Sequence, residues 1–152
     1  MHPYRIGALL LALNTFVSAQ SSLHLIPIPR EVHAAADQSL ASGVAILCAA
    51  PCDADDTFAT NDLKAFLAAR SITVNAAAPV HILITRYGTP LSKSIYTGAL
   101  PQGAALEPTP EIKPEGYAII PDQKGIAFPG FTASAVFYAI QTVKQLIEGD
   151  GP

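Results

Sequence analysis

Two helical patterns of apolar residues constrain this fold more than any other feature of the sequence. Residues 56–70 and residues 133–148 each have apolar side chains at the spacing of one helix face. These positions are Ala59, Leu63, Phe66 and Leu67 in the first segment and Val136, Ile140, Val143 and Ile147 in the second. Aspartates precede the first segment, where the helix dipole favours negative charge, and Thr132 can cap the second. Two such helices need a layer that covers their apolar stripes.

Short runs rich in β-branched and apolar residues can supply that layer. They are residues 44–48, 72–74, 80–86, 115–121 and 125–128. The last two predict a hairpin because a short turn-forming segment joins them. Residues 23–29 predict an extended edge segment, since two prolines cannot donate to a central ladder. Residues 87–114 hold five of the 13 prolines and predict a long loop, with at most a short element at 94–97.

The fold class predicted from these patterns is α+β. We expect a mixed, mostly antiparallel sheet of about five to seven short strands, with both helices packed on one face.

Residues 1–19 predict a signal peptide. Arg5 precedes an apolar run of 14 residues from Ile6 to Ala19, and small or tolerated side chains at residues 17–19 suit cleavage after Ala19. The alternative is an uncleaved anchor helix, although about 20 residues are needed to cross a bilayer. Cleavage leaves 133 of the 152 residues, and we expect residues 20–150 to form one exported domain, periplasmic or extracellular.

The amino-acid composition and the net charge indicate which class of protein this is and which partners to expect. Hydrophobic residues make up 50% of the chain and charged residues 14%, which favours a globular domain over a disordered one. The net charge is −3, and no run of basic residues is present to neutralise phosphates. We therefore expect no nucleic-acid partner, and no membrane partner after leader cleavage.

Cys48 and Cys52 form a possible disulfide, because an exported chain meets oxidising conditions. Two free, buried thiols are the alternative. Zinc would need two more ligands, and His33 and His81 each stand alone in the sequence. We therefore expect no metal site.

The sequence contains no motif that identifies catalytic or cofactor-binding residues. It lacks the nucleophile elbow G-x-S-x-G and the common phosphate-binding loops. His81 lies in a predicted strand with no partner in sight, and the carboxylates at 55–56 and at 111 and 115 are typical of a solvated surface. Five aromatic residues lie in the last third of the chain, where helix and hairpin periodicity favours core positions over a sugar-stacking platform. They are Tyr117, Phe128, Phe131, Phe137 and Tyr138.

A family resemblance is carried mainly by the two ends of this chain. Residues 115–117 (Glu-Gly-Tyr) with the following hairpin, then Phe137-Tyr138 and residues 141–147, resemble the end of the N-terminal, non-catalytic domain of family 20 β-N-acetylhexosaminidases. Residues 25–30 look like the opening P-x-P-R/K segment of that domain. Ala135 and Ala139 stand where the family usually has glycines. The resemblance covers residues 23–148 and implies a zincin-like fold of the hexosaminidase N-terminal domain type.

What the resemblance implies for function is an accessory role. In such enzymes an adjacent Asp-Glu pair in a following (β/α)8 barrel works with the substrate's own acetamido group. The sequence has no Asp-Glu dipeptide, and a barrel of about 250 residues does not fit. The resemblance thus implies an exported β-N-acetylhexosaminidase, a glycosidase of carbohydrate metabolism that removes terminal N-acetylhexosamine residues. The chain would be truncated before the catalytic barrel, its partner, and inactive alone.

Two alternatives stay open. The first is a stand-alone exported module that binds carbohydrate or protein without catalysis. The second is a small enzyme that uses the 87–114 loop as its site. That loop offers Lys93, Lys113, Glu107 and Glu111, but no His or Cys to act with them.

Overall fold

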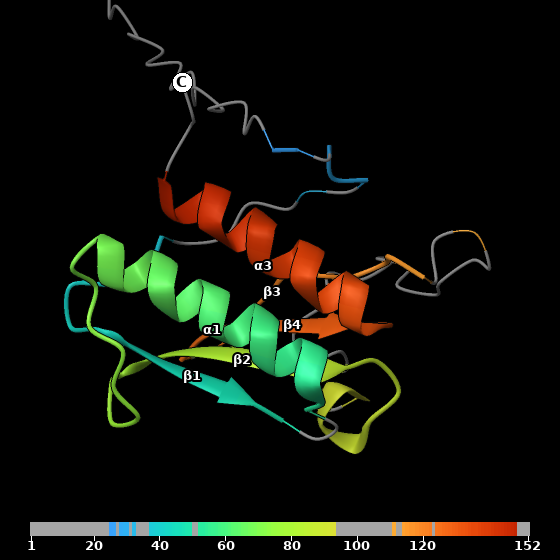
Figure 1. The fold of residues 1–152 in the computed structure, drawn as a ribbon, viewed down its shortest axis with the longest axis horizontal. Coiled ribbons are helices and arrows are strands. Elements are labelled where there is room, and N and C mark those ends of the chain that lie inside the picture. Colours follow the sequence, from blue (N-terminus) through green and yellow to red (C-terminus); the bar gives the residue numbers. More distant parts are fainter. Residues whose placement is uncertain are drawn as a thin grey trace, which may run out of the picture.

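A computed structural model of the chain describes residues 25–26, 28–30, 32, 37–49, 52–93, 111, 114–122 and 124–148. The predicted signal peptide, residues 1–19, lies outside these residues and stays a prediction. The elements follow one another along the chain as shown in Figure 1. They are β1 (Val44–Cys48), α1 (Ala54–Ala69), β2 (Val80–Arg86), β3 (Ile120–Asp122), β4 (Gly125–Gly130) and α3 (Ala133–Glu148).

The four strands form one mixed sheet in the order β1-β2-β4-β3. β1 pairs with β2 and β2 pairs with β4 in parallel, whereas β3 and β4 are antiparallel. The α+β class and the mixed sheet are confirmed, but the expected excess of antiparallel pairs is wrong for the described strands. The reason is connectivity. Helix α1 carries the chain from β1 back to the start of β2, and only β3 and β4 are joined by a tight turn.

The described part of the chain holds four strands rather than the predicted five to seven. Residues 72–74 contribute a single parallel bridge, between Val74 and Val44. A turn follows directly. The side-chain oxygen of Asn75 accepts a hydrogen bond from the Ala77 N–H, and the backbone carbonyl of Asn75 accepts one from the Ala78 N–H. This turn ends the pairing before a strand can form. In the predicted edge segment the described residues are not in a strand, and Ile26 is instead held by the Gln145 side chain through both backbone groups.

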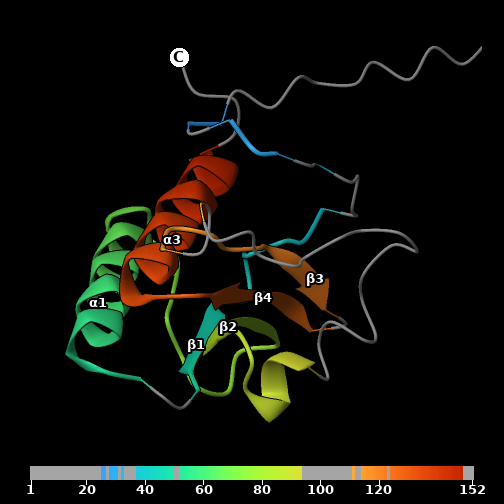
Figure 2. The ribbon, with the colours of Figure 1, turned by 90° about the vertical axis from the view of Figure 1, so that its right-hand side faces the viewer.

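Both helices lie on the same face of the sheet and run in the same direction, as predicted for their apolar stripes (Figures 1 and 2). Every predicted stripe position is either fully buried or packed against the core. The core joins these side chains to Val44, Ile82, Ile84 and Phe128 of the sheet. The prediction of two helices covering one sheet face is therefore confirmed.

Local sequence signals set where the helices begin. Asp53 is the N-cap of α1, and with Asp56 it makes a capping box, so this helix starts two residues before the predicted position. The Thr132 hydroxyl accepts from the Ala135 N–H at 3.1 Å and caps α3 as predicted. The Tyr117 hydroxyl lies 2.6 Å from that of buried Thr142, which ties the segment before β3 to α3.

The predicted hairpin is confirmed as β3 and β4, and Gly125 at its turn is required by close approach. A Cβ atom on Gly125 would lie 1.9 Å from the backbone oxygen of His81. After β2, residues 90–93 form a helical turn. The predicted short element at 94–97 lies outside the described residues.

Candidate functional site

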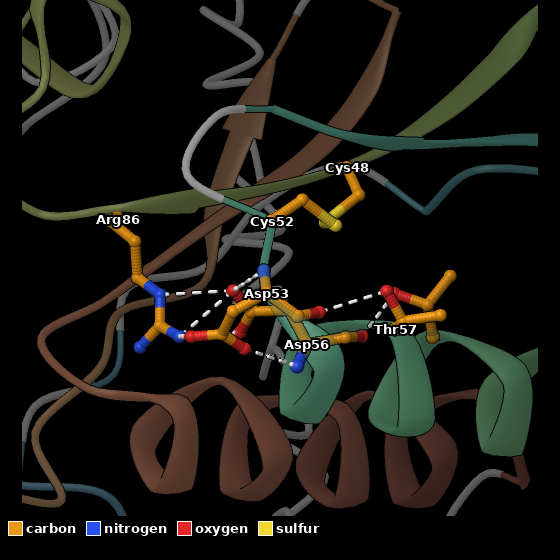
Figure 3. The surroundings of a disulfide bond; sticks show 7 residues. Cys48, Cys52, Asp53, Asp56, Thr57 and Arg86 are labelled. Carbon is orange, nitrogen blue, oxygen red and sulfur yellow. Dashed lines mark hydrogen bonds and ion pairs between the residues drawn. A yellow bond between two sulfur atoms is a disulfide. The ribbon is translucent and has the colours of Figure 1, made fainter.

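A charged cluster joins the end of β2 to the start of α1 (Figure 3). Arg86, the last residue of β2, places Nη2 2.8 Å from each oxygen of Asp56 and 3.0 Å from Asp53 Oδ2. Its Nε donates to Asp56 Oδ2 at 3.1 Å. The Asp56 side chain is 1% exposed and that of Arg86 is 11% exposed. Arg86 and Asp56 thus form a buried ion pair that fixes a helix to a strand, whereas the Asp53 side chain is exposed.

The two cysteines lie beside this cluster. Cys48 ends β1, Cys52 directly precedes the N-cap Asp53, and the structure joins them in a disulfide. Figure 3 shows the bridge above the first turn of α1, with Thr57 donating to the Asp53 backbone carbonyl at 2.8 Å. Disulfide, cap and ion pair thus hold the same junction between β1, β2 and α1.

Two carboxylates have pKa values below their usual range. The backbone N–H of Asp56 lowers the pKa of Asp53, with Arg86 adding to the effect. The Lys144 ammonium lowers the pKa of Asp62, and the amide of Gln141 contributes through a hydrogen bond of 3.0 Å. Asp62 lies on α1, and its partners lie on α3. Partners within the fold explain the lowered pKa of both carboxylates. Neither carboxyl group has the raised pKa of a general acid.

A shallow pocket of about 250 Å³ lies where α1 and α3 begin. Its lining combines aromatic rings with two polar side chains. The lining residues are Asp55, Phe58, Ala133, Ser134, Phe137 and Tyr138. Phe58 is 67% exposed and Tyr138 is 37% exposed, whereas Phe137 is half-buried and makes an edge contact with the Tyr138 ring.

The sheet face opposite the helices carries a second apolar feature. Ile82 and Ile84 of β2 point to the helices, so Leu83 between them faces the other way. Leu47 of β1 pairs with Leu83 in the parallel register and is 42% exposed. Leu91, in the helical turn after β2, is also exposed.

The residues weighed as candidates in the sequence are dispersed. His81 lies in β2, where its backbone N–H donates to the Lys124 carbonyl at 2.7 Å. Glu111 and Glu115 are exposed on the described part of the loop, as is Lys93, while Glu107 and Lys113 lie outside the described residues. His33, the other isolated histidine, also lies outside them.

The five aromatic residues of the last third have three different environments. Phe128 is fully buried, and Tyr117 and Phe137 pack against the core. Phe131 stacks on Tyr87 with ring centroids 4.3 Å apart. Tyr138 is exposed at the pocket. Sequence periodicity therefore explains most of these residues, and it missed Phe58, the most exposed ring at the pocket. The signal for Phe58 is its place outside the apolar stripe of α1.

Among the described residues, no group of three or more His, Cys, Asp and Glu side chains lies close enough together to hold a metal ion. Within the same ranges no helix has the length and hydropathy of a membrane span. Exposed apolar side chains lie both at the pocket on the helix layer and on the Leu47–Leu83 face of the sheet.

One protein family matches nearly the whole chain. The family described as glycosyl hydrolase family 20, domain 2, matches residues 22–152. No curated protein matches the chain.

Proposed function

The chain belongs to glycosyl hydrolase family 20, as its domain 2, and from this premise we propose that it is the non-catalytic accessory domain of an exported β-N-acetylhexosaminidase. In this proposal the chemistry belongs to a catalytic barrel that follows in the same enzyme, and the chain alone is inactive. The match over residues 22–152 is the observation that carries the proposal.

The layered fold supports one mode of docking. The helices occupy one face of the sheet, so a second domain has the opposite face available. On that face Leu47, the fourth of the five residues of β1, is exposed beside Leu83 of the next strand. Adjoining apolar side chains that are partly exposed can form part of a surface that another domain covers. We propose that the catalytic barrel packs there.

The ion pairs of the described residues support a structural role. The carboxylates of Asp53, Asp56 and Asp62 all pair with cations of the same fold. Glycoside cleavage commonly uses two carboxyl groups that flank one bond, with one of them held protonated. These three aspartates instead stabilise the helix layer.

The test measures hydrolysis of p-nitrophenyl N-acetyl-β-D-glucosaminide. The full chain is exported from a host, alone and together with the catalytic domain that follows it in the gene. The chain alone should release no nitrophenol, and the two domains together should co-elute and hydrolyse the substrate. Turnover by the chain alone, at a rate proportional to its concentration, would refute the accessory role.

A further inference from the structure

One side chain of the last helix holds the N-terminal segment of the described chain. The Gln145 carboxamide of α3 accepts a hydrogen bond from the Ile26 N–H and donates one to the Ile26 carbonyl, both at 2.8 Å. The two residues lie 119 positions apart in the sequence, and Figure 2 shows the segment beside the last turns of α3. No other hydrogen bond or ion pair joins residues 25–26 and 28–30 to the described remainder of the chain.

Gln145 supplies to Ile26 the pairing that a neighbouring strand would otherwise supply. In an antiparallel pair, one residue donates through its N–H and accepts through its carbonyl. A carboxamide carries both an acceptor and a donor, so a single glutamine can replace that partner. The prolines at 27 and 29 have no N–H to donate, and a longer ladder is therefore disfavoured. The pairing is thus confined to one residue.

A single apolar side chain assists these two hydrogen bonds. Leu25 is 8% exposed, although it does not belong to the core cluster. Ile26 and Ile28 are 78% and 89% exposed, so their side chains add little to the attachment. A region with so few buried contacts opens without unfolding of the whole molecule.

We propose that residues 25–26 and 28–30 form a strap that opens and closes on α3 as a unit of its own, and that Gln145 is its latch. Closing the strap buries Leu25 and pairs the backbone of Ile26. Opening it breaks both contacts and leaves the core between helices and sheet intact, because that core contains neither residue. The latch lies in the last turn of α3, away from the pocket at the start of that helix.

The experiment is amide hydrogen exchange of the full exported chain, followed by NMR at the Ile26 N–H. In the native chain we expect this amide to exchange more slowly than in an unstructured peptide of the same sequence. It should exchange much faster than the Ile82 amide in the central strand β2. Gln145→Met keeps a side chain of similar length and removes both hydrogen bonds, so it should speed exchange at Ile26 roughly tenfold. Exchange at Ile82 should not change.

Two further variants separate the latch from general effects on α3. Gln141→Met is the matched control, because Gln141 lies one turn earlier and donates to Asp62 rather than to the strap. It should leave exchange at Ile26 unchanged. Gln145→Asn guards against a folding defect, since it keeps a carboxamide on the helix. Its side chain is one methylene shorter and does not reach both groups of Ile26, so it should speed exchange as Gln145→Met does.

Three results would overturn the proposal. Unchanged exchange at Ile26 in Gln145→Met would show that the glutamine is not the latch. Equal acceleration by Gln141→Met would show that any change in this part of α3 loosens the segment. Equal exchange rates at Ile26 and Ile82 in the native chain would show that the segment opens only when the whole molecule unfolds.

Discussion

The guanidinium of Arg86 neutralises a carboxylate that water scarcely reaches. Replacing it by Met in Arg86→Met leaves Asp56 buried without its cation, and breaking a buried pair in this way costs about 3–5 kcal/mol. We expect the free energy of unfolding, measured in urea, to fall by that amount. Arg70→Met is the control, since the Arg70 and Glu148 side chains are both more than one-third exposed, and such pairs contribute no more than about 1 kcal/mol. Equal losses in the two variants would contradict the assigned role of Arg86.

The Asp62 carboxylate links stability to pH. Its pKa in the folded protein is lowered from the usual 3.8, chiefly by Lys144. A lowered folded pKa gives stability that is fully present above the pKa of the unfolded chain. That stability is lost as the pH falls from about 3.8 through the lowered folded value. We expect the thermal midpoint of the native chain to drop across this window, and the drop to be smaller in Asp62→Asn. An identical pH profile in the variant would show that Asp62 does not contribute.

The contacts and roles of single residues were the hardest features to predict from the sequence. The sequence indicates that aspartates begin α1, but it does not indicate which residue pairs with Asp56. Arg86 lies 30 positions away, and only the fold brings the two side chains together. Phe58 was overlooked for a similar reason. Periodicity identifies residues that face a core, and it gives no function to a ring that faces away.

At the scale of elements, the disulfide joins the end of β1 to the start of α1 four positions later. A loop this short constrains the unfolded chain by on the order of 2 kcal/mol. We expect the double variant Cys48→Ser, Cys52→Ser to lose about that much stability in urea. Reductant should lower the urea midpoint of the native chain and leave that of the double variant unchanged. A reductant-insensitive native chain would show that the bond contributes nothing.

The helices were predictable because an apolar stripe at helical spacing is a local signal, and both lie within two residues of their predicted bounds. The hairpin was predictable because its turn is local as well. Strand pairing was not, since the parallel pairs join residues 36 and 44 positions apart, such as Val44 with Val80 and Ile82 with Ile126. A local sequence pattern does not predict which distant strands pair with each other.

At the scale of the whole molecule, the two layers present different surfaces. The helix layer presents the Phe58 pocket, and the sheet presents Leu47 and Leu83. We expect Leu47→Asp to weaken co-elution with the catalytic domain while lowering the free energy of unfolding by about 1 kcal/mol, the span of strand propensities at a partly exposed position. Leu146→Asp, on the helix layer, should leave co-elution intact. The opposite pattern would place the interface on the helices.

If this chain is the accessory part of a larger glycosidase, the DNA beyond the codon for Pro152 encodes the rest of the enzyme, and sequencing that DNA is the most direct test. We expect the reading frame to continue for about 250 residues or more, with alternating strand and helix patterns and an adjacent Asp-Glu pair. A stop codon directly after Pro152, with no such pair encoded downstream, would contradict it.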